Sequence, residues 1–115
     1  MKNINIKFIP FKEQRYETYG DYWKNKNGDW EIRVSQELGD WQENLACAIH
    51  EIIEFALLET REIKEEVVMN FDKKHISHPD PGFHPESPYH NEHYFAHVID
   101  NLIIEELKKQ YAQKT

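Results

Sequence analysis

Three ionisable residues interrupt an apolar run near the middle of the chain. The run covers residues 45–58, and the three are His50, Glu51 and Glu54. Side chains four positions apart share one face of a helix, so His50 and Glu54 project side by side, with Glu51 about 100° round the same turn. Leaving even one simple polar group unpaired among apolar side chains costs roughly 2–7 kcal/mol. The pattern therefore predicts a divalent metal held by His50 and Glu54, with Glu51 acting as general base on a water at that metal.

The third ligand is expected from a second helix near the C-terminus. Four residues there share one face because they are spaced at positions i, i+3, i+4 and i+7: His93, Ala96, His97 and Asp100. Catalytic zinc commonly binds two histidines, one carboxylate and a water, and His50, Glu54 and His93 supply that set. Zinc–ligand bonds near 2 Å require these three side chains to converge to within about 4 Å of one another.

An alternative interpretation needs no metal. The same three side chains, His50, Glu54 and His93, could form a buried hydrogen-bond network that ties the two helices together. The HExxE spacing is a weak pattern by itself, because histidine and glutamate are common on helices. In the metal-free case neither zinc nor a chelator would change the stability of the protein.

Periodicity and capping predict the elements that position these residues. Residues 4–8 alternate between apolar and polar and predict a first or edge strand, which Pro10 ends. Residues 16–23 and 30–34 flank a turn-forming segment and predict a β-hairpin whose aromatic side chains belong to the core. The fold class expected is α+β, with a small antiparallel sheet of about three strands packed on two or three helices.

The helix that carries the HExxE motif should begin at Trp41 and end near Thr60. Asp40 is its expected N-cap, and Glu43 completes a capping box. Residues 61–68 either continue this helix or begin a second, amphipathic one, whose inward side chains would be Ile63, Val67 and Phe71.

Residues 72–86 have no helical periodicity and contain several prolines, so no regular helix is expected there. The part from His75 to His84 would form a loop over the cleft. Ser87 should cap the last helix, with Pro88 at its first position and its end near Gln110. The expected buried stripe of this helix consists of Phe95, Val98, Ile99, Leu102, Ile103 and Leu107.

Composition restricts the classes of partner. The chain has 115 residues, enough for one domain over 1–115, and its 21 acidic against 14 basic side chains give a net charge of -7. That charge argues against nucleic acid as a partner, and no apolar run approaches the roughly 18 residues that a membrane span needs. A single cysteine, Cys47, and a start that lacks signal-peptide features predict a cytoplasmic protein. The oligomeric state is left open.

The order of these features resembles that of a known class of enzymes. A strand over residues 30–34, a short connector and a helix that bears the His50-Glu51 pair resemble the minimal zincin-like metallopeptidase domains of phages and mobile elements, over roughly residues 28–60. The HEIIE motif, the segments 71–72 and 79–89, and the later pattern of Tyr89, His93, Ala96 and Asp100 are similar to a family of small phage and prophage proteins of unknown function. This second resemblance covers most of residues 45–107.

The resemblance implies a site formed by His50, Glu51, Glu54 and His93, with Asp72, Tyr89 and Asp100 in supporting roles. Asp100 would orient a ligand imidazole, and Tyr89 or His97 would polarise a substrate carbonyl. Glu54 stands where HExxH peptidases have their second histidine.

The leading hypothesis is a zinc-dependent, peptidase-like hydrolase of phage or prophage origin that acts on a protein or peptide. Another divalent metal, such as manganese, iron or nickel, fits the same residues. The competing hypothesis is a non-enzymatic module that binds a protein partner through its acidic surface, with the HExxE and histidine site structural.

Overall fold

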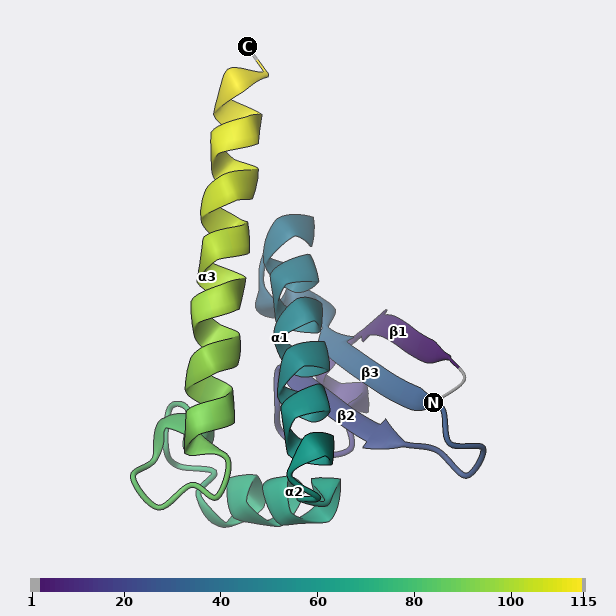
Figure 1. Ribbon diagram of the computed structural model, residues 1–115. Helices are drawn as coiled ribbons and strands as arrows, with labels where there is room; N and C mark the ends of the chain where they lie inside the picture. Colours follow the sequence, from purple (N-terminus) through teal and green to yellow (C-terminus); the bar gives the residue numbers. More distant parts are fainter. Residues whose placement is uncertain (1–2, 115) are drawn as a thin grey trace.

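The computed structural model describes residues 3–114 and has an α+β fold, which confirms the predicted fold class. Three strands form one sheet, and three helices follow them in the chain (Figure 1). The strands are β1 (Ile4–Ile9), β2 (Gly20–Lys24) and β3 (Trp30–Ser35). The helices are α1 (Trp41–Thr60), α2 (Glu65–Lys74) and α3 (His90–Gln113). In the described residues no helix is both long enough and apolar enough to cross a membrane.

The sheet is mixed, which corrects the prediction of an antiparallel sheet. Strands β2 and β3 form the predicted antiparallel hairpin, and Gly28 takes the positive φ of 82° that its turn requires. Strand β1 lies at the edge, as predicted, but pairs in parallel with β3, with Ile4 opposite Trp30. The chain reverses once between β1 and β2 and again in the hairpin, so β3 runs in the direction of β1. Alternating residues predict a strand but say nothing about the direction of its neighbour.

Helix α1 lies between the sheet and α3 (Figure 1). Its Phe55 stacks on two aromatic rings of the hairpin, with ring centroids 4.7 Å from Tyr22 and 4.4 Å from Trp30. Ile32 and Leu58 are buried beside them. Each buried side chain of this size stabilises the fold by about 1.5–3 kcal/mol, so α1 is fixed firmly against the sheet. The prediction that the aromatic side chains of this region belong to the core is confirmed for Tyr22 and Trp30 but is wrong for Tyr19, which is 56% exposed.

The bounds predicted for α1 are confirmed, and the helix ends in a Schellman motif. The Asp40 carboxylate accepts a hydrogen bond from the Glu43 amide at the N-terminus. At the C-terminus Glu62 takes a φ of 60°, and the Ile63 amide donates to the Leu58 carbonyl at 2.9 Å. The chain therefore turns sharply, and α2 is a separate helix.

Helix α2 differs from the prediction in two respects. It continues to Lys74, so residues 72–74 are regular helix although no helix was expected over residues 72–86. Val68 is buried, whereas Val67, which was expected to face inward, is 44% exposed. Phe71 and Ile63, which precedes the helix, pack against the core as predicted, so only the inward position of Val67 is wrong.

Helix α3 runs alongside α1 (Figure 1). Its predicted buried stripe is confirmed only in part, since Ile99, Ile103 and Leu107 are half-buried. It begins at His90 rather than Pro88, because the Ser87 hydroxyl accepts from the Tyr89 amide in a turn before the helix. Three side chains of the expected stripe are exposed: Phe95 at 51%, Val98 at 40% and Leu102 at 57%. The side that packs on α1 carries Ala96, which is fully buried, and the polar residues of the candidate site.

Candidate metal centre

Three ligand atoms from α1 and α3 converge as the sequence predicts. His50 Nε2 lies 3.1 Å from Glu54 Oε2 and 3.2 Å from His93 Nδ1, and His93 Nδ1 lies 2.8 Å from the same Glu54 oxygen. Zinc bonds of 2.0–2.2 Å in a tetrahedral site place neighbouring ligand atoms about 3.3 Å apart. The triangle formed by His50, Glu54 and His93 therefore has nearly the size that one such ion requires.

A carboxylate on the opposite ring nitrogen orients each imidazole. His50 Nδ1 donates to Asp100 Oδ2 at 2.7 Å, and His93 Nε2 donates to the Asp80 carboxylate at 3.0 Å. Each bond places a proton on the outer nitrogen and leaves the nitrogen that faces Glu54 free to bind a cation. Histidine ligands of metals usually have such a partner, so the surroundings of both rings match a metal centre.

Glu54 and the ring of His93 are held by the sheet and by the loop before α3. The Tyr22 hydroxyl on β2 donates to Glu54 Oε1 at 3.1 Å, which leaves Oε2 for the two histidines. A Cβ on Gly82 would lie 2.4 Å from the His93 ring, so only glycine leaves room for that ring.

His50, Glu54 and His93, which we call the triad, favour positive charge on the two histidines. Burial alone would lower the pKa of His50, but hydrogen bonds to Asp100 and Glu54 raise it to about 10. Burial alone would likewise lower the pKa of His93, but hydrogen bonds to Asp80 and Glu54 raise it to about 9. Burial would raise the pKa of Glu54, but the two histidines lower it instead. Without a metal both histidines are thus protonated, and each carries one positive charge. One divalent ion bound to two neutral imidazoles would bring the same total charge.

Glu51 is buried beside the triad and packs against β2. A Cβ on Gly20 would lie 2.1 Å from Glu51 Oε1, so the missing side chain of Gly20 makes the space for this carboxyl group. Burial, followed by the nearby Glu54 carboxylate, raises the pKa of Glu51 to about 8. Its carboxyl group can therefore gain or lose a proton near neutral pH.

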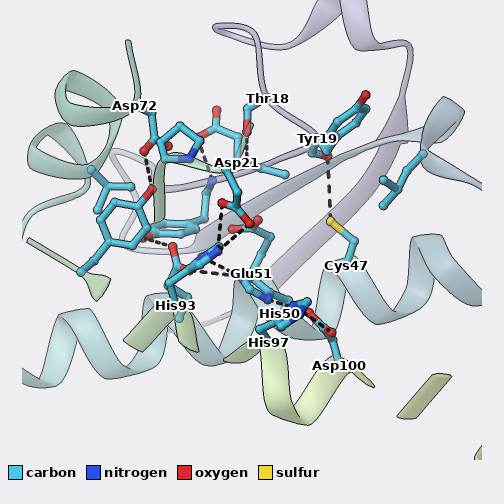
Figure 2. A pocket seen from close by; sticks show the side chains of 18 of the residues that line it. Thr18, Tyr19, Asp21, Cys47, His50, Glu51, Asp72, His93, His97 and Asp100 are labelled. Carbon is cyan, nitrogen blue, oxygen red and sulfur yellow. Dashed lines mark hydrogen bonds and ion pairs between the residues drawn. The ribbon is translucent and has the colours of Figure 1, made fainter. Parts of the chain in front are cut away.

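A pocket of about 510 Å³ opens beside these residues, and α1, α3, β2 and the loop before α3 all contribute to its walls. Figure 2 shows His50 beside Asp100, with Asp72 farther away, beyond His93. Cys47 also lines it, and burial raises the pKa of its thiol.

The other predicted residues lie in or near this pocket. The hydroxyl of Tyr89 donates to Asp72, which also accepts from Tyr16 at 2.8 Å. Burial raises the pKa of Asp72 to about 6 despite these bonds. His97 is half-exposed, and its Nδ1 lies 3.6 Å from Asp100 Oδ1. Of the two residues expected to polarise a substrate, His97 is half-exposed, whereas Tyr89 is buried and its hydroxyl already donates to Asp72.

Sequence reasoning missed four residues that shape the site: Gly20, Tyr22, Asp80 and Gly82. The sequence places Asp80 only in the proline-rich segment 72–86 and Tyr22 only in the core. Their roles depend on contacts across the fold, Asp80 with α3 and Tyr22 with α1, for which neither spacing nor periodicity gives a signal. The expected loop over the cleft is present in part, since residues 78–81 line the pocket.

Comparisons of this chain with protein-family models, with curated proteins and with solved structures found no match. The case for a metal centre therefore rests on the geometry of the site.

Proposed function

We propose that this protein binds zinc through His50, Glu54 and His93 and acts as a metal-dependent hydrolase on a peptide or protein. The observation that carries the proposal is the orientation of the two imidazoles. Asp100 and Asp80 each bond the outer nitrogen of one ring, and the inner nitrogens meet at the same oxygen of Glu54. Zinc rather than calcium or magnesium suits two nitrogen donors and one carboxylate.

Zinc would supply a Lewis acid that polarises a carbonyl group and lowers the pKa of a bound water toward about 7. Glu51 supports the base role by its place, because its carboxyl group is buried beside the triad, where it could accept a proton from a water on the metal and return it to a leaving group. The adjoining pocket of about 510 Å³ is large enough for a short length of substrate. The resemblance to minimal zincin-like domains of phages supports a peptide as the substrate class.

The first test is metal analysis of protein prepared without a histidine tag. Wild-type protein should retain zinc, and Glu54→Gln and His93→Gln should each lose one equivalent, because two remaining ligands hold the ion weakly. His90→Gln, on the same helix but outside the triad, is the matched control and should keep the wild-type content. Equal zinc content in all four proteins would rule out the triad as a metal centre.

The catalytic part of the proposal is tested by Glu51→Gln. This variant should keep its zinc and lose at least 100-fold of any hydrolysis of peptides or esters, because an amide cannot accept the proton. If Glu51→Gln retained its activity, Glu51 would not be the general base.

The exposed apolar side chains of α3 support a second candidate, a protein-binding module with a structural metal. Phe95, Val98 and Leu102 are on the outer side of that helix and available to a partner. In that case a chelator should lower the melting temperature sharply, while no peptide or ester is hydrolysed by the zinc-loaded protein.

A further inference from the structure

A second group of metal-binding side chains lies outside the pocket, where α2 ends and the following loop returns toward α3. Ligand atoms of His75, His84 and Glu86 all lie within 4.8 Å of one another. The rings of His75 and His84 are tilted against each other, with centroids 4.4 Å apart. None of these three residues is among those that line the pocket in the described part of the chain.

The donor set and the orientation of His75 suit a transition metal. Two histidines and one carboxylate are a common ligand set for zinc, and both rings are half-buried while Glu86 is exposed, so an ion can enter from solvent. His75 Nδ1 donates to the Phe71 carbonyl at 3.0 Å, which leaves Nε2 free to bind a metal. The Phe71 ring stacks on His75 with centroids 4.1 Å apart and holds its plane.

His84 provides a direct reporter of binding. In the metal-free loop its Nδ1 accepts a hydrogen bond from the Glu86 amide at 3.0 Å. A metal at Nδ1 would take that lone pair, and a metal at Nε2 would require a proton on Nδ1. Either mode ends the bond from the Glu86 amide.

The segment between the two histidines carries the groups that position His93. Asp80 bonds His93 Nε2, and Gly82 makes the space for the His93 ring. A metal that joined His75 to His84 would close residues 76–83 into a fixed loop. Asp80 and Gly82, which lie in that loop, could then occupy fewer positions. The loop would then hold the candidate centre in its binding geometry.

We propose that His75, His84 and Glu86 bind a second zinc ion, which fixes residues 76–83 against α3. Binding of this ion does not require the triad, whereas its effect on His93 rests on the proposed function.

Zinc stoichiometry at micromolar free zinc tests the binding. His75→Ala/His84→Ala should hold one ion fewer than wild type, and His90→Gln should match wild type. Two ions in wild type and one in the double variant would support both sites. One ion in wild type and none in the double variant would support this site while the proposed triad fails. Equal zinc content in wild type and double variant would overturn the inference.

Two further measurements keep the test decisive where the double variant folds poorly. His84→Gln, a single change in a loop, should lose the same ion while its circular dichroism stays that of wild type. Zinc should also shift the amide resonance of Glu86 and slow hydrogen exchange over residues 76–83 in wild type and in His93→Gln, which lacks the triad. The second zinc site would be overturned if zinc did not slow hydrogen exchange over residues 76–83 in His93→Gln, or if it left the amide resonance of Glu86 unmoved.

Discussion

At the scale of single residues, the two histidines of the candidate centre differ in what the sequence reveals. His50 was identifiable because it lies among apolar side chains four residues before Glu54, and Asp100 because it shares a helical face with His93. Asp80, the partner of His93, was not identifiable from the sequence, because it lies in a proline-rich loop whose path no periodicity describes. Ligands within helices are thus predictable from spacing, whereas loop groups that orient them depend on the fold.

The role of Asp100 leads to a prediction. Asp100→Asn keeps a hydrogen-bond acceptor for His50 Nδ1 but removes the negative charge that makes the ring a stronger ligand. The affinity for zinc should fall about 10–100-fold, as is typical when such a partner is changed. Competition with a chromophoric chelator measures the affinity. Glu105→Gln removes an exposed charge from the same helix and serves as the control, and an equal loss in both variants would assign the effect to overall charge.

At the scale of elements, caps and local periodicity predicted the helices better than the sheet or the buried faces. The bounds of α1 follow from Asp40 and from the apolar run, both of which are local signals. The parallel pairing of β1 with β3 joins residues 26 positions apart, and no local signal encodes it. The stripe of α3 was predicted only in part because this helix buries polar site residues toward α1 and leaves Phe95 and Leu102 exposed, opposite to the usual pattern.

The turn between α1 and α2 allows a direct test of the Schellman motif. Glu62 has a left-handed conformation at a position that usually holds glycine, and this costs a residue with a side chain about 1–2 kcal/mol. Because glycine is more flexible when unfolded, Glu62→Gly should raise the free energy of unfolding by only ~0.5–1 kcal/mol. Urea unfolding followed by circular dichroism measures this. Glu66→Gly, within α2, should instead destabilise by about 1 kcal/mol.

At the scale of the whole molecule, the site unites parts of the chain that are far apart in sequence. Helices α1 and α3 supply the candidate ligands, β2 supplies Tyr22 and the space at Gly20, and the loop before α3 supplies Asp80. The sequence was sufficient to predict the α+β class and the convergence of His50, Glu54 and His93. It was not sufficient for the surrounding groups, whose positions depend on how the sheet, α1 and the loop pack together.

This assembly predicts opposite effects of pH on the metal-free and zinc-bound proteins. The pKa values of His50 and His93 are raised to about 10 and about 9 in the folded chain, above the ordinary value near 6.5. Their protonated forms therefore stabilise the metal-free fold fully below about pH 6.5, and this stabilisation is lost as the pH rises through about 9 and 10. Glu51, whose pKa is raised to about 8, acts in the same direction, because its ionisation is disfavoured in the fold.

Zinc must displace both histidine protons, so its affinity rises with pH by up to about two powers of ten per unit below pH 9. Between pH 6.5 and 8.5 the melting temperature of the metal-free protein should fall, while the increase caused by a fixed concentration of free zinc should grow. Scanning calorimetry in a zinc buffer measures both, and titration calorimetry in buffers of different ionisation enthalpy counts the released protons. With His93→Gln the release should drop by about two protons, because this variant loses the triad ion and neither histidine of the triad then gives up its proton to zinc. A zinc-dependent increase that stayed constant across this range would mean that the ion binds elsewhere than at these two imidazoles.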